Sequence, residues 1–241
     1  MKKRYTADFE TCTWLEDETY VWAWAICDID NPDICYLGTD IEDFIEFCRT
    51  SKNATFYFHN LKFDSEFAIY WLLNNGFEWV PDRKQVHDKS FTTLINDMGV
   101  FYSVSIYFKK NKTSANKVTL IDSLKIIPFS VDETAEAFNL SISKLSIDYN
   151  KYRERGHILT QEEESYIIND VSIMAQALKV VFDEGLTKMT RAGNAMHDFK
   201  SIMGSEDKFL HYFPKLDFRL DEQIRKCYKR RLYISKSHLS R

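Results

Sequence analysis

The sequence predicts an α/β protein in which a central β-sheet is flanked by helices. Two observations support this class. Short runs rich in aromatic and β-branched residues come first, and segments with apolar residues at helical spacing lie between and after them. Hydrophobic residues make up 44% of the 241 positions, against 7 glycines and 4 prolines, so the chain can bury a sizeable core.

The predicted strands lie in the first half of the chain. An acidic turn, residues 14–19, separates the first two, and the last group forms a β-meander around a lysine-rich turn. The expected strands cover residues 3–11, 20–29 and 54–60, with 32–38 as a candidate third and the meander at 91–123.

The predicted helices follow from apolar spacing and from residues that start and stop helices. They cover residues 40–51, 63–76, 130–139 and 159–185. Gly76 and Gly185 stand where helix ends are expected, because glycine readily adopts the left-handed conformation of a C-terminal stop. Thr160 and Glu163 have the spacing of a capping box at the start of the longest helix.

Composition excludes several classes. The formal net charge of −4 gives no sign of nucleic-acid binding by bulk charge. The five cysteines contain no C-x-x-C pair, which argues against a disulfide framework and a zinc ribbon and favours reduced thiols in a cytosol. The start lacks an apolar signal-peptide core, and the longest apolar run, VWAWAIC, is too short to cross a bilayer. We expect a cytoplasmic protein without a membrane span.

The helical and strand patterns lapse at residues 187–196, which predicts a domain boundary there. Beyond Glu222 no acidic residue occurs, and cations alternate with Tyr228 and Tyr233. This composition suits single-stranded nucleic acid, with an unfolded tail as an equal alternative. For the lysine-rich turn within residues 107–117, a solvated turn is favoured over a phosphate-binding arm.

Acidic side chains on three predicted elements point to metal chemistry. Asp8 and Glu10 lie two apart on a strand and so share a face. Asp64 lies near a helix start, and Tyr166 and Asp170 are four apart on the longest helix. Taken alone, each feature has another explanation. Asp8 and Glu10 could keep an edge strand soluble, and Asp64 could be an ordinary residue of a first helical turn. Tyr166 could be a core residue, with Asp170 in solvent. Together, the four carboxylates could stay ionised around divalent Mg²⁺ or Mn²⁺. Two such ions would favour phosphodiester hydrolysis by water, which the tyrosine would orient.

The strings DFET, FHNLKFD and YIIND resemble the three motifs of DEDD 3′–5′ exonucleases, which have a ribonuclease H-like fold with a central mixed sheet. More narrowly, YFHNLKFD, DSLKIIPF and IDYNKYRERG resemble protein-primed family B DNA polymerases of small Bacillus phages, and the likeness runs from about residue 4 to residue 228. The resemblance implies an exonuclease domain at residues 1–190. It also implies that residues 191–241 are a basic extension similar to the start of a polymerase region.

The resemblance also implies roles for individual residues. The metal ligands would be Asp8, Glu10, Asp64 and Asp170, holding two Mg²⁺ or Mn²⁺ ions. Tyr166 would position the attacking water, since Ser165 stands where the other exonuclease class has histidine. Lys144 would assist catalysis near the scissile phosphate. The residues implied as contacts to single-stranded DNA are Thr11, His59, Asn60, Phe63, Phe67, Ser123, Leu124 and Tyr149. A core role for Phe63 and a capping role for Ser123 stay open.

The expected function is hydrolysis of single-stranded DNA from its 3′ end to nucleoside monophosphates. The polymerase patterns D-x-x-S-L-Y-P and Y-x-D-T-D-S do not occur, and Arg230 and Arg231 replace two glycines of the family's linker, so no polymerase activity is expected from this chain. The alternatives are a non-catalytic module that binds DNA, a terminal protein or another replication protein, and an exonuclease acting on RNA. The expected location is the cytoplasm of a phage-infected or prophage-bearing bacterium.

Overall fold

A computed structural model describes residues 3–15, 18–110, 115–149 and 151–237. The chain divides into two compact units, Met1–Asn194 and Ala195–Arg241. The assignment of the second unit to a polymerase region stays a prediction. Three predicted features extend beyond the described residues: the acidic turn at residues 16–17, the lysine-rich turn at residues 111–114, which includes Lys112, and the C-terminal cation Arg241.

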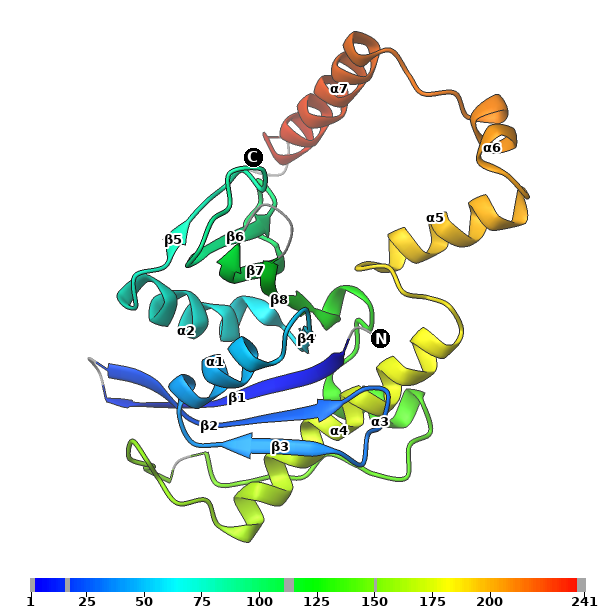
Figure 1. The fold of residues 1–241 in the computed structure, drawn as a ribbon. Coiled ribbons are helices and arrows are strands. Elements are labelled where there is room, and N and C mark those ends of the chain that lie inside the picture. Colours follow the sequence, from blue (N-terminus) through cyan, green and yellow to red (C-terminus); the bar gives the residue numbers. More distant parts are fainter. Residues whose placement is uncertain (1–2, 16–17, 111–114, 150, 238–241) are drawn as a thin grey trace. The chain divides into compact units, whose positions relative to one another are not determined.

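In the described part of the first unit, eight strands form one mixed sheet in the order β3-β2-β1-β4-β8-β7-β6-β5 (Figure 1). β1 pairs parallel to β4, and β4 parallel to β8, while β1, β2 and β3 are antiparallel neighbours, as are β6, β7 and β8. The strands are β1 (Arg4–Leu15), β2 (Glu18–Asp28), β3 (Cys35–Gly38), β4 (Thr55–Phe58), β5 (Glu78–Trp79), β6 (Ser90–Ile95), β7 (Phe101–Lys110) and β8 (Ala115–Asp122).

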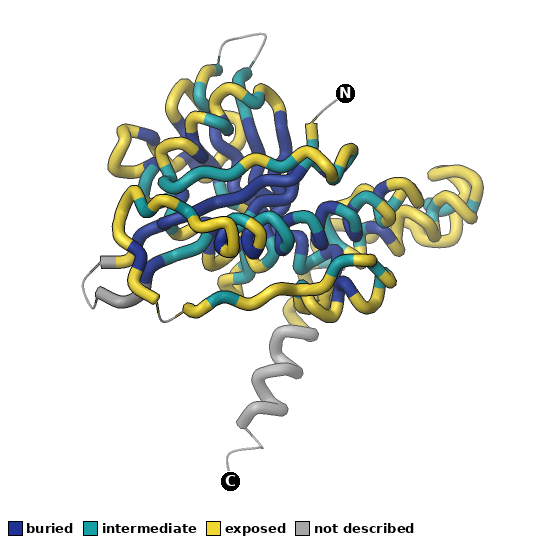
Figure 2. The backbone as a smooth tube through the Cα atoms, turned by 90° about the horizontal axis from the view of Figure 1, so that it is seen from below, coloured by how far each residue is buried: buried dark blue, intermediate teal, exposed yellow. Residues whose placement is uncertain are grey.

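Helices cover both faces of this sheet. α1 and α2 pack with one apolar cluster around Phe44, Phe56 and Phe58, and α4 packs on the other face with a cluster around Trp22 and Ile167. Figure 2 shows that the central strands are buried. The helices are α1 (Ile41–Thr50), α2 (Leu61–Asn74), α3 (Val131–Ala137), α4 (Gln161–Asp183), α5 (Arg191–Ile202), α6 (Glu206–Tyr212) and α7 (Phe218–Ser237), with the 3₁₀ turn η1 at Ser123–Lys125.

Local signals explain where the helices of the first unit begin and end. The capping box of Thr160 and Glu163 is confirmed at the start of α4, and Gly185 adopts a φ of 84° just beyond its end. α2 begins at Leu61, two residues before the predicted start, because Asn60 adopts a left-handed φ of 74° and turns the chain directly out of β4.

The structure adds elements that the sequence pattern does not predict. β5 has only two residues, too few for a periodic signal. In the second unit, Phe199, Phe209 and Phe213 pack against one another with ring centroids 5.2–6.0 Å apart. Much of the basic segment lies in α7, so this part is helical rather than an unfolded tail. Among the described helices, none combines the length and apolar character needed to cross a membrane.

Candidate active site

Four acidic residues reach the site from three elements of the first unit. Asp8 and Glu10 lie on β1, where they alternate with the buried apolar side chains of Ala7 and Phe9. Asp64 is buried in the first turn of α2. The fourth is Asp170, which is buried in the middle of α4. The parallel pairing of β1 with β4, which leads directly into α2, brings the first two elements together.

Burial and mutual repulsion raise the pKa values of these carboxyl groups. The pKa of Asp8 is raised to about 7, first by burial and then by the charge of Asp170. The pKa of Glu10 is raised to about 8, by burial and then by Asp8 and Asp170. Burial, followed by the charges of Asp8 and Glu10, raises the pKa of Asp64 well above its ordinary value. These couplings join side chains of β1, α2 and α4 into one electrostatic group.

A lysine from a loop distant in the sequence contacts this group. Lys144 Nζ lies 3.2 Å from Oδ2 of Asp170, whereas Oδ1 of Asp170 is buried and has no hydrogen-bond partner among the residues that the structure describes. Burial raises the pKa of Asp170, and the ammonium group opposes the shift only in part. Burial lowers the pKa of Lys144, but the Asp170 carboxylate outweighs this effect, so the net pKa is raised. Lys144 is therefore a stable cation at the acidic group.

The donor set fits a hard divalent cation. Ionised carboxylates are hydrogen-bond acceptors only, and crowding them raises their free energy unless a cation lies between them. In the described ranges, no three His, Cys, Asp or Glu side chains are placed so that they could hold a metal ion together. Asp8, His59 and Asp170 nevertheless line one small cavity of about 10 Å³. The carboxylate oxygens of Asp8 and Asp170, including the buried Oδ1 of Asp170, suit Mg²⁺ or Mn²⁺.

Tyr166 is buried on α4, one turn before Asp170. Its hydroxyl lies 2.6 Å from the hydroxyl of Tyr149. Burial, followed by the charge of Glu10, raises the pKa of Tyr166 far above its ordinary value, so the phenol stays protonated. It can therefore donate a hydrogen bond at the acidic group, as the orientation of a water molecule requires.

Two of the predicted DNA contacts, His59 and Ser123, form hydrogen bonds within the protein. His59 Nδ1 lies 3.1 Å from Ser123 Oγ, and His59 Nε2 lies 2.7 Å from the carbonyl oxygen of Phe129. Ser123 is fully buried and donates to the carbonyl of Phe58 at 3.0 Å. Burial lowers the pKa of His59, and the hydrogen bond to the carbonyl oxygen of Phe129 opposes this shift only in part. Ser123 thus has an internal hydrogen-bonding role, but the capping role that the sequence leaves open for it belongs to its neighbour Asp122.

The other predicted contacts form a more accessible surface at the start of α2. Asn60 is exposed, and its side chain makes no capping bond. Phe63 is 48% exposed, and its ring centroid lies 5.8 Å from that of Phe67. Thr11 and Leu124 are half-buried. An exposed aromatic ring packed on a half-buried one, beside polar groups, is the composition expected for contacts to unpaired bases.

The sequence reading misses Asp122, a buried residue at the end of β8. Its Oδ1 accepts the backbone N–H groups of Asn60, Leu61 and Leu124 at 3.2, 3.4 and 3.1 Å. Lys125 Nζ lies 3.3 Å from its Oδ2. Asp122 therefore holds two predicted DNA-binding segments together. The available signal is an aspartate followed by Ser-Leu-Lys at a strand end, which is typical of a cap.

A second missed contribution comes from Glu163, which the sequence predicts only as a helix cap. Its carboxylate accepts from Arg153 Nε and His157 Nε2, each at 2.7 Å, and from the backbone N–H of Thr160 at 3.0 Å. Glu163 and Arg153 are both buried. This network fastens the loop after Tyr149 to the start of α4, close to Tyr166.

Comparison with known proteins identifies relatives. The family model "DNA polymerase type B, organellar and viral" matches residues 45–162. The DNA polymerases of Bacillus phage Nf and Bacillus phage phi29 are each 37% identical over 228 residues, which is 95% of this chain and 39% of each relative. That of Streptococcus phage Cp-1 is 34% identical over 237 residues, covering 92% of this chain and 38% of the relative. The chain thus spans about two fifths of the length of these relatives.

Solved structures agree with the sequence comparison. Phi29 DNA polymerase complexed with single-stranded DNA matches with a TM-score of 0.86 and 36% identity, over 93% of this chain and 39% of that chain. Its ternary complex with primer-template DNA and incoming nucleotides also gives a TM-score of 0.86 at 36% identity, over 93% of this chain and 38% of that chain. The matched exonuclease region has the ribonuclease H-like fold, which confirms the predicted fold class. Over nearly its whole length, the chain is therefore similar to the proofreading exonuclease region of the phage DNA polymerases, and part of it matches the organellar and viral type B DNA polymerase family.

Proposed function

We propose that the chain is a metal-dependent 3′–5′ exonuclease that releases nucleoside monophosphates from single-stranded DNA. The observation that carries this proposal is that Asp8 on β1 and Asp170 on α4 line one cavity, while Asp64 is buried at the start of α2, directly after the strand that pairs with β1. Buried carboxylates that repel one another are costly, and a cation-binding function gives them a reason. The relatives' DNA complexes support DNA as the substrate.

The four carboxylates would hold two Mg²⁺ or Mn²⁺ ions, which when bound stabilise charge on the oxygens of a phosphodiester during attack by water. The chain itself supplies the remaining functions at this centre. Tyr166 donates its phenolic proton in a hydrogen bond that orients the water. The Lys144 ammonium offsets negative charge that develops on the phosphate.

The substrate strand would be held without reading its sequence. Phe63 and Leu124 pack against the terminal bases, because every base has an apolar face. Asn60 and Thr11 hydrogen-bond sugar and phosphate oxygens. His59, Phe67 and Tyr149 complete the contacts, and buried Ser123 supports His59 from beneath. A terminal protein or another replication protein would be a further partner, in the cytoplasm of a phage-bearing bacterium.

The test is digestion of a 5′-labelled single-stranded oligonucleotide with Mg²⁺, with Mn²⁺ and with a chelator. We expect shortening from the 3′ end that the chelator stops. Asp8→Asn and Asp170→Asn should each abolish activity while circular dichroism stays unchanged. Glu136→Gln, at an exposed position of α3, is the control and should digest like the parent. Full activity of Asp8→Asn would refute the site.

A non-catalytic DNA-binding module is the second candidate. The observation that favours it is the Lys144 ammonium at Asp170, because this cation already offsets part of the acidic charge in place of a metal. Under this alternative, oligonucleotides bind but are not shortened in any divalent metal.

Parallel digestion of matched DNA and RNA strands separates DNA from RNA as the substrate, since the 2′-hydroxyl is the difference to be sensed.

A further inference from the structure

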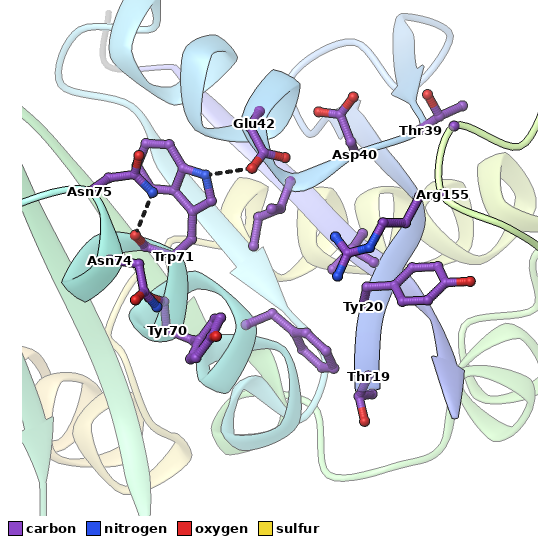
Figure 3. A pocket seen from close by; sticks show the side chains of 14 residues that line it. Thr19, Tyr20, Thr39, Asp40, Glu42, Tyr70, Trp71, Asn74, Asn75 and Arg155 are labelled. Carbon is purple, nitrogen blue, oxygen red and sulfur yellow. Dashed lines mark hydrogen bonds between the residues drawn. The ribbon is translucent and has the colours of Figure 1, made fainter. Parts of the chain in front are cut away.

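A second cavity lies beside the proposed exonuclease site, within the first unit. It has a volume of about 620 Å³ and lies between the β1–β2 ribbon, α1, α2 and the loop at Arg155 (Figure 3). Two contacts link it to the site. Phe67 lines the cavity and packs against Phe63, and Val21 on its wall is the register partner of Thr11. The cavity is in the size range of small-ligand sites.

The walls combine aromatic rings with a guanidinium group. Figure 3 shows Tyr20 and Arg155 on one wall and Tyr70 and Trp71 on the other. The Arg155 guanidinium carbon lies 4.6 Å from the centroid of the Tyr20 ring, which places a cation over an aromatic plate. Tyr70 is 73% exposed although it is a large aromatic side chain. Its ring is therefore accessible to a molecule bound in this cavity.

The two acidic residues that line the cavity, Asp40 and Glu42, each accept a hydrogen bond from the protein. Glu42 Oε1 accepts from Trp71 Nε1 at 2.9 Å, which fixes the indole in the wall (Figure 3). Asp40 Oδ1 accepts the backbone N–H of Asp43 at 2.8 Å and caps α1. Each carboxylate keeps one further oxygen that can accept from the N–H groups of a base. The cavity therefore offers flat apolar surfaces, one cation and hydrogen-bond acceptors, which match the base, phosphate and amino groups of a nucleotide.

We propose that this cavity binds a nucleotide of the substrate strand on the 5′ side of the terminal nucleotide. The inference rests on the proposed exonuclease function, since a strand whose 3′ end lies at Asp8 can continue only in the 5′ direction. The base stacks against Tyr70, and Arg155 contacts the adjacent phosphate. Stacking platforms with nearby cations are how proteins hold single strands without sequence preference.

The test measures binding without hydrolysis. Labelled thymidine oligonucleotides, a dinucleotide and a hexanucleotide, are titrated with the full chain in the presence of a chelator, and fluorescence anisotropy is read. The parent should bind the hexanucleotide more tightly than the dinucleotide. Tyr70→Ser and Arg155→Gln should each lower the ratio of hexanucleotide affinity to dinucleotide affinity by about tenfold. This is the change expected for loss of one base stack or one phosphate contact. Arg155→Gln should also reduce the salt slope by about one.

Matched variants separate recognition from folding. Tyr70→Phe keeps the ring and should retain the gain, and Arg83→Gln removes an exposed cation outside the cavity and should bind like the parent. Equal losses on both oligonucleotides, or no loss with either variant, would overturn the proposal. The proposal would also be overturned if thymidine 5′-monophosphate displaced the hexanucleotide and its binding needed both Tyr70 and Arg155. That result would identify the cavity as a site for the reaction product. If binding depends on oligonucleotide length but no digestion occurs with Mg²⁺ or Mn²⁺, the subsite is supported and only the exonuclease proposal is refuted.

Discussion

The hydroxyl groups of Tyr149 and Tyr166 lie 2.6 Å apart, and their rings meet edge to face at 85°. The sequence predicts one of them as a DNA contact and the other as the group that orients water. A phenol can donate one hydrogen bond and accept others, so Tyr149 can determine the direction in which Tyr166 donates. Tyr149 is therefore a candidate positioning residue as well as a surface for the strand.

Replacing Tyr149 with phenylalanine should lower kcat by about five- to tenfold, the value of one hydrogen bond of about 1 kcal/mol. KM should change little, because the ring that packs near the strand is kept. Tyr166→Phe should cost more, about a hundredfold, since it removes the donor itself. Steady-state digestion of a labelled oligonucleotide over a range of concentrations gives kcat and KM for both variants. The positioning role is wrong if Tyr149→Phe changes KM alone.

Removal of the lysine charge should slow the reaction. Lys144→Gln takes away the ammonium 3.2 Å from Asp170, and we expect kcat to fall by about a hundredfold, as for loss of one charge-stabilising group. The metal-free variant should also lose thermal stability, because Asp170 then has no cation. Lys52→Gln, at an exposed position, is the control for both measurements. An unchanged kcat would exclude Lys144 from catalysis.

The acidic group should reduce stability when no metal is bound. The pKa of Glu10 is raised from its ordinary 4.5 to about 8 in the folded chain, by burial and then by neighbouring carboxylates. The folded state thus holds more protons than the unfolded state between these values, so stability falls as pH rises through this range. At pH 8 in chelator, Glu10→Gln should be more stable than the parent by at least about 1 kcal/mol.

Calorimetry with and without Mg²⁺ checks this sign. Mg²⁺ should raise the Tm of the parent more than that of Glu10→Gln, since the variant has lost one oxygen anion. The same variant should lose hydrolysis, so stability and activity change in opposite directions. A Glu10→Gln chain that melts below the parent in chelator at pH 8 would contradict the coupling.

Glu163 should stabilise the fold in the opposite pH direction. Burial alone would raise its pKa, but the Thr160 N–H, His157 and Arg153 outweigh it, so the pKa lies below its ordinary 4.5. Its contribution is therefore complete above pH 4.5 and is lost as pH falls below that value. At pH 7, Glu163→Gln should lower the free energy of unfolding by about 3 kcal/mol, because Arg153 is left buried without a counter-charge.

Urea unfolding at pH 7 and at pH 3.5 measures this difference, which should shrink at the lower pH. Glu162→Gln, an exposed neighbour in the same helical turn, should change stability little at either pH. A loss that is equal at the two pH values would show that the carboxylate charge is not the stabilising feature.

Much of the secondary structure could be predicted because its signals are local. The capping box at Thr160 and the glycine after α4 act on their own helix, so the bounds of α4 follow from adjacent residues. The residue types of the candidate site were also readable, since Asp8, Glu10, Asp64 and Asp170 stand in strings that resemble a known family. α2 begins earlier than predicted because the left-handed Asn60 is a consequence of its place between β4 and Asp122.

The sequence by itself determined the α/β class, the order of the elements and the kinds of side chain offered for chemistry, because periodicity and helix caps depend on neighbours in the chain. Only the tertiary structure decided that Lys144 meets Asp170, that Tyr149 meets Tyr166, and that α2 and the loop at Arg155 enclose a cavity. These contacts join segments far apart in sequence. Their distances depend on strand register and helix packing, which no local pattern encodes.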